Sequence, residues 1–367
     1  MVAVHGLHPA ARDDATLERA RELVMEYGWN ATAYQIINPG ISHWFSARAD
    51  AVVGYVRSGR VLVAAGAPVC ARDRIESVAA EFEAHADFAG DRICYFGAGE
   101  RLEAIYRREH DHSIVGLGAQ PSWDPRVWPE IVARRASVRA QLNRARNKGV
   151  LVSRWPSVRA SQDPALRRCL AEWLAARRLP PLHFLVEPDT LGQLADRRVF
   201  VADRDNVPVG FLIASPVPAR NGWLIEQIIR GRDAPNGTAE ILIDTAMRSV
   251  AAEGASYVTL GLAPLSRHSS YDSGASPLWL RATLRWVRAH GRRFYNFEGL
   301  DTFKSKFEPQ TWEEITAISY GSSFPLASLY AIVAAFGARA PAAFVITAMS
   351  KALSQEAGWL RARWIGH

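Results

Sequence analysis

Apolar positions along the first third of the chain follow helical and strand periods in turn. Thr16 opens a helical pattern that stops at Gly28, as expected for a capped helix with a glycine stop. Strand-like runs at 51–57 and 60–65 are joined by Ser58-Gly59, which predicts a hairpin with a tight turn. The pattern then predicts a helix at 72–86, a strand at 93–96, a helix at 100–109 and a strand at 113–118.

A comparable series follows residue 150. A helical pattern begins at Pro164, and strands at 199–203 and 207–215 are predicted to pair through a turn at Asp205-Asn206. A third strand at 223–229 is followed by a helix at 238–253 and a strand at 257–262. Both halves therefore repeat one plan of helix, hairpin, strand, helix and strand, and the fold class is predicted as α/β with an internal duplication.

Length and composition agree with two globular units. The chain has 367 residues, of which 49% are hydrophobic and 22% charged, and this excludes disorder, collagen and a small disulfide scaffold. Cys70, Cys94 and Cys169 form no CxxC pair, so we expect three buried thiols and no structural zinc site. The first residues show no secretory signal, and we expect a cytoplasmic protein.

Positive charge is concentrated in one segment. The formal net charge is +7. Residues 128–148 contain one acidic residue, Glu130, and six basic ones: Arg134, Arg135, Arg139, Arg144, Arg146 and Lys148. A helix here would bury one apolar face and expose an arginine strip. Such a strip is usually a solvated helix face, but its concentrated field also suits nucleic acid or anionic lipid, and the residues alone leave these two partners level.

The C-terminal region is rich in apolar residues. Residues 315–338 carry no charge and a second apolar stretch covers 342–349, yet neither reaches the ~20 apolar residues of a membrane-spanning helix. One reading is a helical hairpin packed on the domain. The other is an amphipathic hairpin at a membrane surface, supported by Trp359 and Trp364 among Lys351, Arg361 and Arg363.

Three segments carry candidate chemistry. The strand, basic loop and helix at 223–243 would direct backbone N–H groups near Asn236 and Gly237, with Arg230 and Arg232, at an anion, although such loops are often plain turns. The strand at 257–262 opens into a loop that ends at Ser266. The segment 294–312 contains Lys304 and Lys306 beside Glu298; in a chain with forty arginines, two lysines here indicate compact ammonium donors.

These segments together resemble a known enzyme family. IIRGRDAPNGTAE (228–240), LGLAPLS (260–266) and FYNFEGLDTFKSKFEP (294–309) occur in the order found in the soluble catalytic domain of bacterial phosphatidylglycerol aminoacyltransferases. These are the lysyl- and alanyl-phosphatidylglycerol synthases, or multiple peptide resistance factors. Weaker similarity at AAGAP (64–68) and QLNRARNKGV (141–150) extends the resemblance over about residues 34–320.

The resemblance implies two tandem acetyltransferase-like (GNAT-type) domains joined by a basic helix. The expected boundaries are 14–127 for the first domain, 128–150 for the connecting helix, 151–321 for the catalytic domain and 322–367 for an apolar, amphipathic extension. The implied activity is transfer of an amino acid from aminoacyl-tRNA to the hydroxyl of a membrane lipid such as phosphatidylglycerol. No metal or organic cofactor is expected, because the aminoacyl ester is already activated. The implied location is cytoplasmic, with peripheral contact to the inner face of the membrane through the extension.

The resemblance also implies roles for single residues. Arg230 with Lys304 or Lys306 would hold the terminal phosphate and leaving ribose, and Glu226 or Glu298 would recognise the amino group or act as general base. The expected substrate-binding residues are Glu226, Gln227, Asn236, Gly237, Glu240 and Ser266, and the expected tRNA-binding residues are Arg135, Arg139, Arg144, Arg146 and Lys148. The chain departs from the family pattern where an aspartate is usual: it has Gln227, Glu240 and Ala67.

Two other functions remain open. The first is an acyl-CoA-dependent N-acyltransferase of the same fold, although the loop 232–239 is two residues longer than that donor's usual binding loop. The second is a non-catalytic tRNA- or membrane-binding protein, which would have an apolar pocket.

Overall fold

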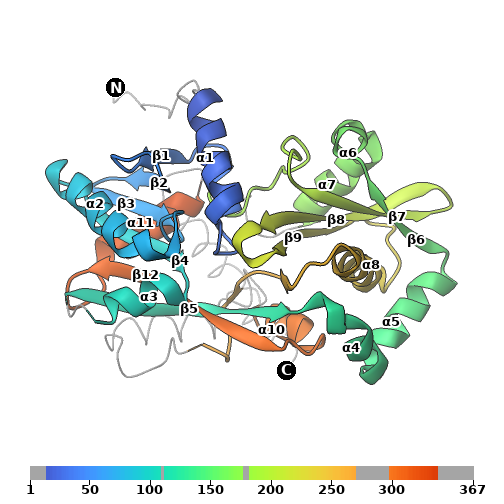
Figure 1. The fold of residues 1–367 in the computed structure, drawn as a ribbon. Coiled ribbons are helices and arrows are strands. Elements are labelled where there is room, and N and C mark those ends of the chain that lie inside the picture. Colours follow the sequence, from blue (N-terminus) through green and yellow to red (C-terminus); the bar gives the residue numbers. More distant parts are fainter. Residues whose placement is uncertain (1–13, 109–110, 177–181, 270–296, 338–367) are drawn as a thin grey trace, which may run out of the picture.

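One mixed sheet runs through the whole molecule in this computed structural model, which describes residues 14–108, 111–176, 182–269 and 297–337 (Figure 1). The strand order is β1-β2-β3-β4-β12-β5-β10-β9-β8-β7-β6, with β11 paired to β5. The strands are β1 (Ser42–Phe45), β2 (Val52–Ser58), β3 (Val61–Ala65), β4 (Arg92–Ala98), β5 (His112–Trp123), β6 (Val150–Trp155), β7 (Arg198–Arg204), β8 (Val207–Val217), β9 (Gly222–Arg230), β10 (Tyr257–Thr259), β11 (Ala263–Pro264) and β12 (Thr311–Tyr320).

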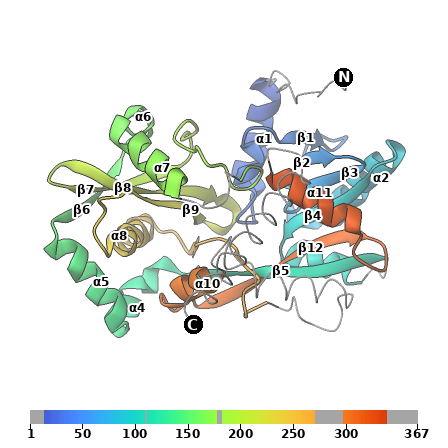
Figure 2. The ribbon, with the colours of Figure 1, turned by 180° about the vertical axis from the view of Figure 1, so that it is seen from behind.

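Helices cover both faces of the N-terminal half of the sheet. Alternation along β3 explains the layers, because successive side chains of a strand point to opposite faces. Val61 and Val63 join the core under α1 (Asp14–Tyr27), η1 (Tyr34–Ile37) and α11 (Leu326–Phe336). Leu62 and Ala64 join the core under α2 (Ile75–Phe88), which follows the turn η2 (Arg72–Arg74), and under α3 (Glu100–Tyr106). Figure 2 shows α11 lying across this half.

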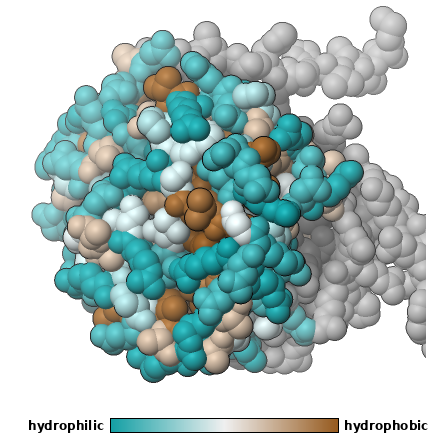
Figure 3. All heavy atoms as spheres, turned by 90° about the vertical axis from the view of Figure 1, so that its right-hand side faces the viewer, coloured by the Kyte–Doolittle hydropathy of each residue, from teal (hydrophilic) through white to brown (hydrophobic). Residues whose placement is uncertain are grey.

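The C-terminal half is layered in the same way. Phe200 and Ala202 of β7 face the core formed by α4 (Trp128–Arg134), α5 (Ala136–Asn147) and α8 (Thr238–Ala252). Val199 and Val201 face α6 (Ser157–Gln162) and α7 (Pro164–Ala176) on the other side. Short 3-10 turns η3 (Pro125–Val127) and η4 (Pro218–Arg220) precede α4 and β9. The outer face of this half is mostly hydrophilic, with apolar side chains in small spots (Figure 3).

Both halves contain the predicted hairpin followed by a helix and a parallel strand. In the first half β2 and β3 form the hairpin, and β3 and β4 pair in parallel around α2. In the second half β7 and β8 form the hairpin, and β9 and β10 pair in parallel around α8. The mixed α/β class is therefore confirmed.

The connection between the halves differs from the predicted one. β12, which follows α10 (Phe297–Ser305) near the end of the described chain, lies between β4 and β5 in the N-terminal half. β5 in turn pairs with β10 of the other half, so a single sheet is continuous across both. Two separate tandem domains are not confirmed, and their boundaries stay a prediction.

The basic segment is two helices, not the single helix predicted for 128–150. α4 ends where Arg135 adopts an extended backbone (φ −93°, ψ 92°), and α5 begins at the next residue. The apolar pattern could not reveal this break, because Ile131, Val138 and Leu142 stay in helical phase across it and all reach one core.

Two further expectations concern cysteines and membranes. All three cysteines are buried free thiols, as predicted, and burial raises the pKa of Cys94 to about 12.

No helix within the described ranges is long and apolar enough to cross a membrane. Most of the predicted C-terminal extension, including Trp359 and Trp364, lies outside the described residues, and both readings of it stay predictions.

Candidate functional site

A cavity of about 1620 Å³ lies between the two halves and takes its walls from both. The N-terminal wall includes the loop after α1, the end of β4 and part of α3. The C-terminal wall includes β9, the loop after β10 and α10. The residues that line the cavity include Trp29, Asn30, Thr32, Gln35, Gly97, Gly99, Gln120, Glu187, Arg220, Glu226, Gln227, Arg230, Glu240, Gly261, Leu262, Lys304 and Glu313.

Lys304 is the buried cation of this cavity. It is 4% exposed, and its Nζ donates to the carbonyl oxygens of Gly261 at 2.7 Å and Leu262 at 2.9 Å. Burial lowers the pKa of Lys304 to about 7, although the nearby charge of Asp301 raises it in part. An ammonium has three N–H donors. Two serve the loop after β10, so Lys304 combines a fixed position with a pKa suited to proton transfer near neutrality.

Lys306 does not line the cavity but contacts a residue that does. Its Nζ forms an ion pair with Glu240 and lies 4.4 Å from the centroid of the Phe303 ring. Glu240, at the start of α8, lines the cavity, whereas Lys306 is not among the lining residues. The predicted pair of lysines is thus split: Lys304 faces the cavity, and Lys306 neutralises a carboxylate that does.

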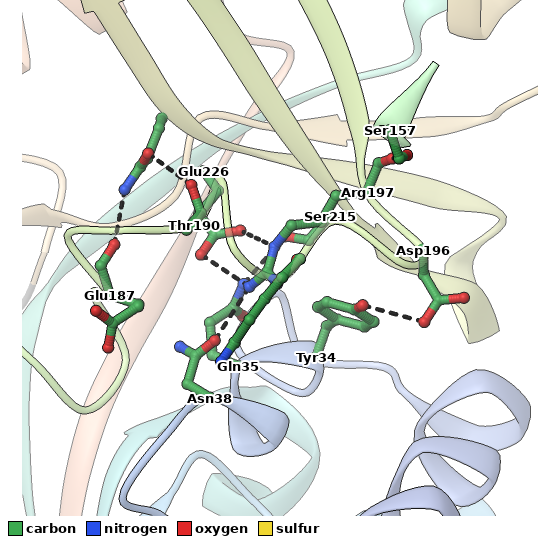
Figure 4. Close-up of polar contacts among 12 residues, drawn as sticks. Tyr34, Gln35, Asn38, Ser157, Glu187, Thr190, Asp196, Arg197, Ser215 and Glu226 are labelled. Atoms are coloured by element: carbon green, nitrogen blue, oxygen red, sulfur yellow. Dashed lines mark hydrogen bonds and ion pairs between the residues drawn. The ribbon is translucent and has the colours of Figure 1, made fainter. Parts of the chain in front are cut away.

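Glu226 is held in a buried ion pair (Figure 4). Its Oε2 lies 2.9 Å from Nε of Arg197, and the two side chains are 6% and 1% exposed. Arg197 also donates to Oδ1 of Asn38 at 3.0 Å and to the carbonyl of Gln193 at 2.6 Å. Glu226 lines the cavity, but its charge is already compensated, so a substrate ammonium would have to compete with Arg197.

Gln227 organises the neighbouring wall. Its Oε1 accepts from the Thr190 hydroxyl at 2.8 Å, and its Nε2 donates to the carbonyl of Glu187 at 2.7 Å. Both ends of the amide are therefore used to hold the segment between Glu187 and Thr190 against β9. A neutral amide at this position serves as a structural clamp in the cavity wall.

Arg230 and the loop after it divide between the cavity and the surface. Arg230 ends β9, is exposed and lines the cavity. Asn236 is exposed away from the lining residues. Gly237 has φ +96°, and a Cβ on it would lie 2.2 Å from the carbonyl oxygen of Gln141 in α5. The predicted anion site at Asn236 and Gly237 is therefore not part of the cavity, because Gly237 is used for close packing of the helices α5 and α8.

Ser266 and Glu298 also lie outside the cavity wall. Ser266 is buried, and its hydroxyl donates to Oδ1 of Asp301 at 2.6 Å, which ties the loop after β11 to α10. Glu298 is exposed on α10. The motifs that contain these residues lie together, since Lys304 donates to the carbonyls of Gly261 and Leu262.

The predicted tRNA-binding strip meets the segment after α10 only at its Arg135 end. Arg139, Arg144, Arg146 and Lys148 are exposed on α5 and after it. Arg146 forms an ion pair with Asp244 at 3.3 Å, so part of the positive charge of the strip is compensated. At the other end Arg135 donates to the carbonyl of Lys306 at 3.2 Å and pairs with Glu308, also at 3.2 Å.

The sequence reasoning missed a second charged network. Arg220 forms two hydrogen bonds with Glu313, at 2.8 and 2.6 Å, and Gln120 donates to the same carboxylate at 2.8 Å. Burial alone would raise the pKa of Glu313, but the bonds from Arg220 lower it below the ordinary value. No sequence signal marks Arg220 among forty arginines, and β12, which carries Glu313, joins this wall only through the non-local pairing with β5.

Within the described ranges, no group of three or more His, Cys, Asp or Glu side chains is arranged to hold a metal ion.

Comparisons with known proteins identify the family. The chain is 22% identical over 301 residues to a phosphatidylglycerol lysyltransferase of Bacillus subtilis (strain 168), and this match covers 81% of the chain but only 34% of that relative. Its fold matches the C-terminal domain of a putative lysylphosphatidylglycerol synthetase from Agrobacterium fabrum, with a TM-score of 0.74, 23% identity and 88% and 96% of the two chains covered. It also matches the structure of L-PGS from Bacillus licheniformis, with a TM-score of 0.72, 20% identity and 91% and 98% covered. Residues 21–318 match the family described as phosphatidylglycerol lysyltransferase, C-terminal, and the chain belongs to that family.

Proposed function

We propose that this chain transfers an aminoacyl group from aminoacyl-tRNA to the hydroxyl of a membrane lipid such as phosphatidylglycerol. Membership of the family supports lipid aminoacylation. The observation that carries the proposal is Lys304, a lysine with a pKa of about 7 that faces a cavity built by both halves. Such a cavity has room for two substrates that meet, and such a lysine suits a reaction that moves one proton.

The proposed reaction is a transesterification. The acceptor hydroxyl oxygen attacks the carbonyl carbon of the aminoacyl ester, and the bond from that carbon to the ribose oxygen of the tRNA breaks. The acceptor's proton passes to the ribose oxygen, so the atoms balance without a further reactant. Lys304 in its neutral form accepts this proton and in its charged form returns it, which fits a pKa near the operating pH. Catalysis otherwise rests on positioning and on stabilising the oxyanion.

The donor end of the site belongs to the C-terminal half. Arg230 binds the terminal phosphate, and its exposure in the cavity lining supports this role. The exposed strip on α5 binds the acceptor arm of the tRNA, and Arg135 links this strip to Lys306, the residue after α10. Lys306 holds Glu240 in the wall and acts as a positioning residue. Glu226 and Gln227 shape the wall through their bonds to Arg197 and Thr190.

The same proposal covers architecture and location. The halves derive from two acetyltransferase-type units, because each contains a hairpin followed by a parallel β-α-β unit. The protein works on the cytoplasmic side of the membrane. The exposed side chains of Leu326 and Tyr330 on the uncharged helix α11 support peripheral contact there.

An acyl-CoA-dependent N-acyltransferase is supported less well. That donor requires free backbone N–H groups where the loop enters α8. Here the N–H of Thr238 is bonded to the carbonyl of Pro235, and Gly237 is packed against Gln141.

The test is a transfer assay with the purified chain. Total tRNA charged with labelled amino acids is mixed with phosphatidylglycerol vesicles, and label is followed into the organic phase with and without RNase. We expect RNase-sensitive transfer that falls by more than about 10²-fold in Lys304→Met, within the range of general acid–base effects. Arg60→Gln, on the exposed turn between β2 and β3, is the control and should leave the rate unchanged. Transfer that resists RNase, or full activity in Lys304→Met, contradicts the proposal.

A further inference from the structure

Three buried polar atoms of one short segment have no hydrogen-bond partner among the described residues: Asn30 Nδ2, Thr32 Oγ1 and Gln35 Oε1. They account for half of the six such atoms in the described chain. All three residues line the N-terminal wall of the cavity, although these three atoms themselves are covered, so a ligand would reach them only after a small shift of the side chains. Buried polar groups in proteins are almost always hydrogen-bonded. Their concentration on one wall of the cavity therefore points to a site that bonds a ligand.

Two glycines without side chains border this segment. A Cβ on Gly66 would lie 2.8 Å from Thr32 Oγ1 and 3.2 Å from Asn30 Nδ2, and one on Gly99 would lie 3.2 Å from Asn30 Oδ1. These glycines follow the carboxyl ends of the parallel strands β3 and β4. That edge of a parallel sheet is where α/β proteins usually bind ligands. The polar side chains thus occupy the space that larger residues at the glycines would fill.

Gln35 is fixed by the opposite half of the molecule (Figure 4). It is 1% exposed, and its Nε2 donates to Oγ of Ser215 on β8 at 3.0 Å. This bond orients the amide and leaves Oε1 as an acceptor. The three atoms together offer an amide donor, a hydroxyl and an amide acceptor, with no net charge. A neutral ligand group that both donates and accepts, such as an alcohol, matches this set.

A positive charge lies beside the neutral cluster. The guanidinium carbon of Arg101 is 3.3 Å from the centroid of the Trp29 ring, one residue before Asn30, and that of Arg220 is 4.7 Å away. Arg220 is neutralised by Glu313, whereas no carboxylate of the described chain lies within ion-pair distance of Arg101. Burial and the charges of Arg72 and Arg220 lower the pKa of Arg101, although the charge of Glu100 raises it in part. An anion would relieve this repulsion.

We infer that the Asn30–Gln35 segment binds a phosphoglycerol headgroup, with its diol at Asn30, Thr32 and Gln35 and its phosphate toward Arg101. The inference rests on the proposed function and names the acceptor's subsite. One hydroxyl of the diol is held by the cluster, which leaves the other to attack the aminoacyl ester. The N-terminal wall thus presents the acceptor, while the C-terminal wall with Lys304 and Arg230 presents the donor.

Thr32→Val tests the subsite, because it removes Oγ1 and keeps the side-chain shape. We expect the KM for dioleoyl phosphatidylglycerol in mixed micelles to rise about fivefold, with kcat and the KM for aminoacyl-tRNA within about twofold of the unmodified protein. Thermal unfolding should be unchanged or shifted upward, since this hydroxyl has no partner in the described chain. Asn30→Ala is a second variant with the same expected KM effect.

The matched control is Thr316→Val. The hydroxyl of Thr316 is buried like that of Thr32, but it donates to the carbonyl of Ala98 at 3.3 Å. We expect this variant to lose stability and keep the acceptor KM. An unchanged acceptor KM in both Thr32→Val and Asn30→Ala overturns the subsite, as does a rise confined to the KM for aminoacyl-tRNA.

Calorimetry without tRNA separates this inference from the proposed function. Glycerophosphoglycerol should bind the unmodified protein, and Thr32→Val should weaken that binding about fivefold. Glycerol 1-phosphate tests for a free metabolite: binding as tight as that of glycerophosphoglycerol overturns the assignment to a lipid headgroup. If the unmodified protein transfers no amino acid to lipid yet binds glycerophosphoglycerol through Thr32, the proposed function fails and the subsite stands. Transfer without headgroup binding overturns the subsite alone.

Discussion

The two walls of the cavity differ in whether their buried polar groups have partners within the described chain. In the C-terminal wall the charged side chains Glu226 and Glu240 are already paired, with Arg197 and Lys306, and Lys304 is held by two carbonyls. In the N-terminal wall neutral polar atoms at residues 30–35 are buried without partners in the described chain. Both arrangements cost folding free energy, because burying a charge or a polar group without a hydrogen-bond partner is unfavourable.

The difference separates a wall that is rigid before substrate arrives from one that a substrate completes. Paired charges keep their geometry without a ligand, which suits a group that must transfer a proton at a fixed place. Unpaired neutral groups gain hydrogen bonds only when a ligand supplies them, which suits selective recognition.

The largest effect is expected from breaking the buried ion pair. Arg197→Met leaves Glu226 as an uncompensated buried charge and should lower the free energy of unfolding by about 3–5 kcal/mol. Arg154→Met is the control, because its pair with Glu253 is 49% and 40% exposed and should contribute less than about 1 kcal/mol. Urea denaturation of both variants measures the difference. Equal losses would mean that the C-terminal wall does not depend on internal charge compensation.

Lys304 should give a pH-dependent contribution of intermediate size. The unfolded chain keeps its proton up to about pH 10.5, whereas the folded chain releases it near pH 7. Between these values the unfolded state binds more protons, so the stability of the unmodified protein rises with pH. Relative to Lys304→Met it should gain about 2–3 kcal/mol between pH 7 and pH 9. Well below pH 7 both states are protonated and the difference should be constant.

Denaturation at pH 6, 7, 8 and 9 measures this gain. Lys148→Met removes an exposed lysine and should follow the unmodified protein at every pH. Parallel stability curves for Lys304→Met and the unmodified protein would show that Lys304 has an ordinary pKa in the folded state.

Local patterns predicted most elements because the relevant information is local. The stop at Gly28, the turn at Gly59 and the alternation in β3 are properties of neighbouring residues. The position of β12 could not be predicted in this way. Its ten residues pair with strands that lie about two hundred positions earlier, and no local period encodes such a pairing.

The site was predicted in part for a similar reason. Lys304 stood out because lysine is rare in this chain, and Arg230 because it ends a strand before a loop. The roles of Glu226 and Gly237 depend on Arg197 and Gln141, which lie far away in the sequence. The Asn30–Gln35 segment carries ordinary polar residues, and only the absence of partners within the described chain distinguishes it.

The smallest effect is expected from a single residue of the basic strip, and it tests the assignment of substrates to walls. Arg144 is exposed on α5, so Arg144→Gln should leave stability unchanged. If the strip contacts tRNA phosphates, the KM for aminoacyl-tRNA should rise about fivefold, equivalent to about 1 kcal/mol, and the salt dependence should fall by about one unit of slope. The KM for the lipid should stay constant, the reverse of the result expected for Thr32→Val.

Both KM values are measured at several salt concentrations, with Arg60→Gln as the control, to decide which substrate the basic strip binds. A lipid KM that rises instead would place the acceptor, not the tRNA, on the basic strip, and the contrast between a donor wall and an acceptor wall would be wrong.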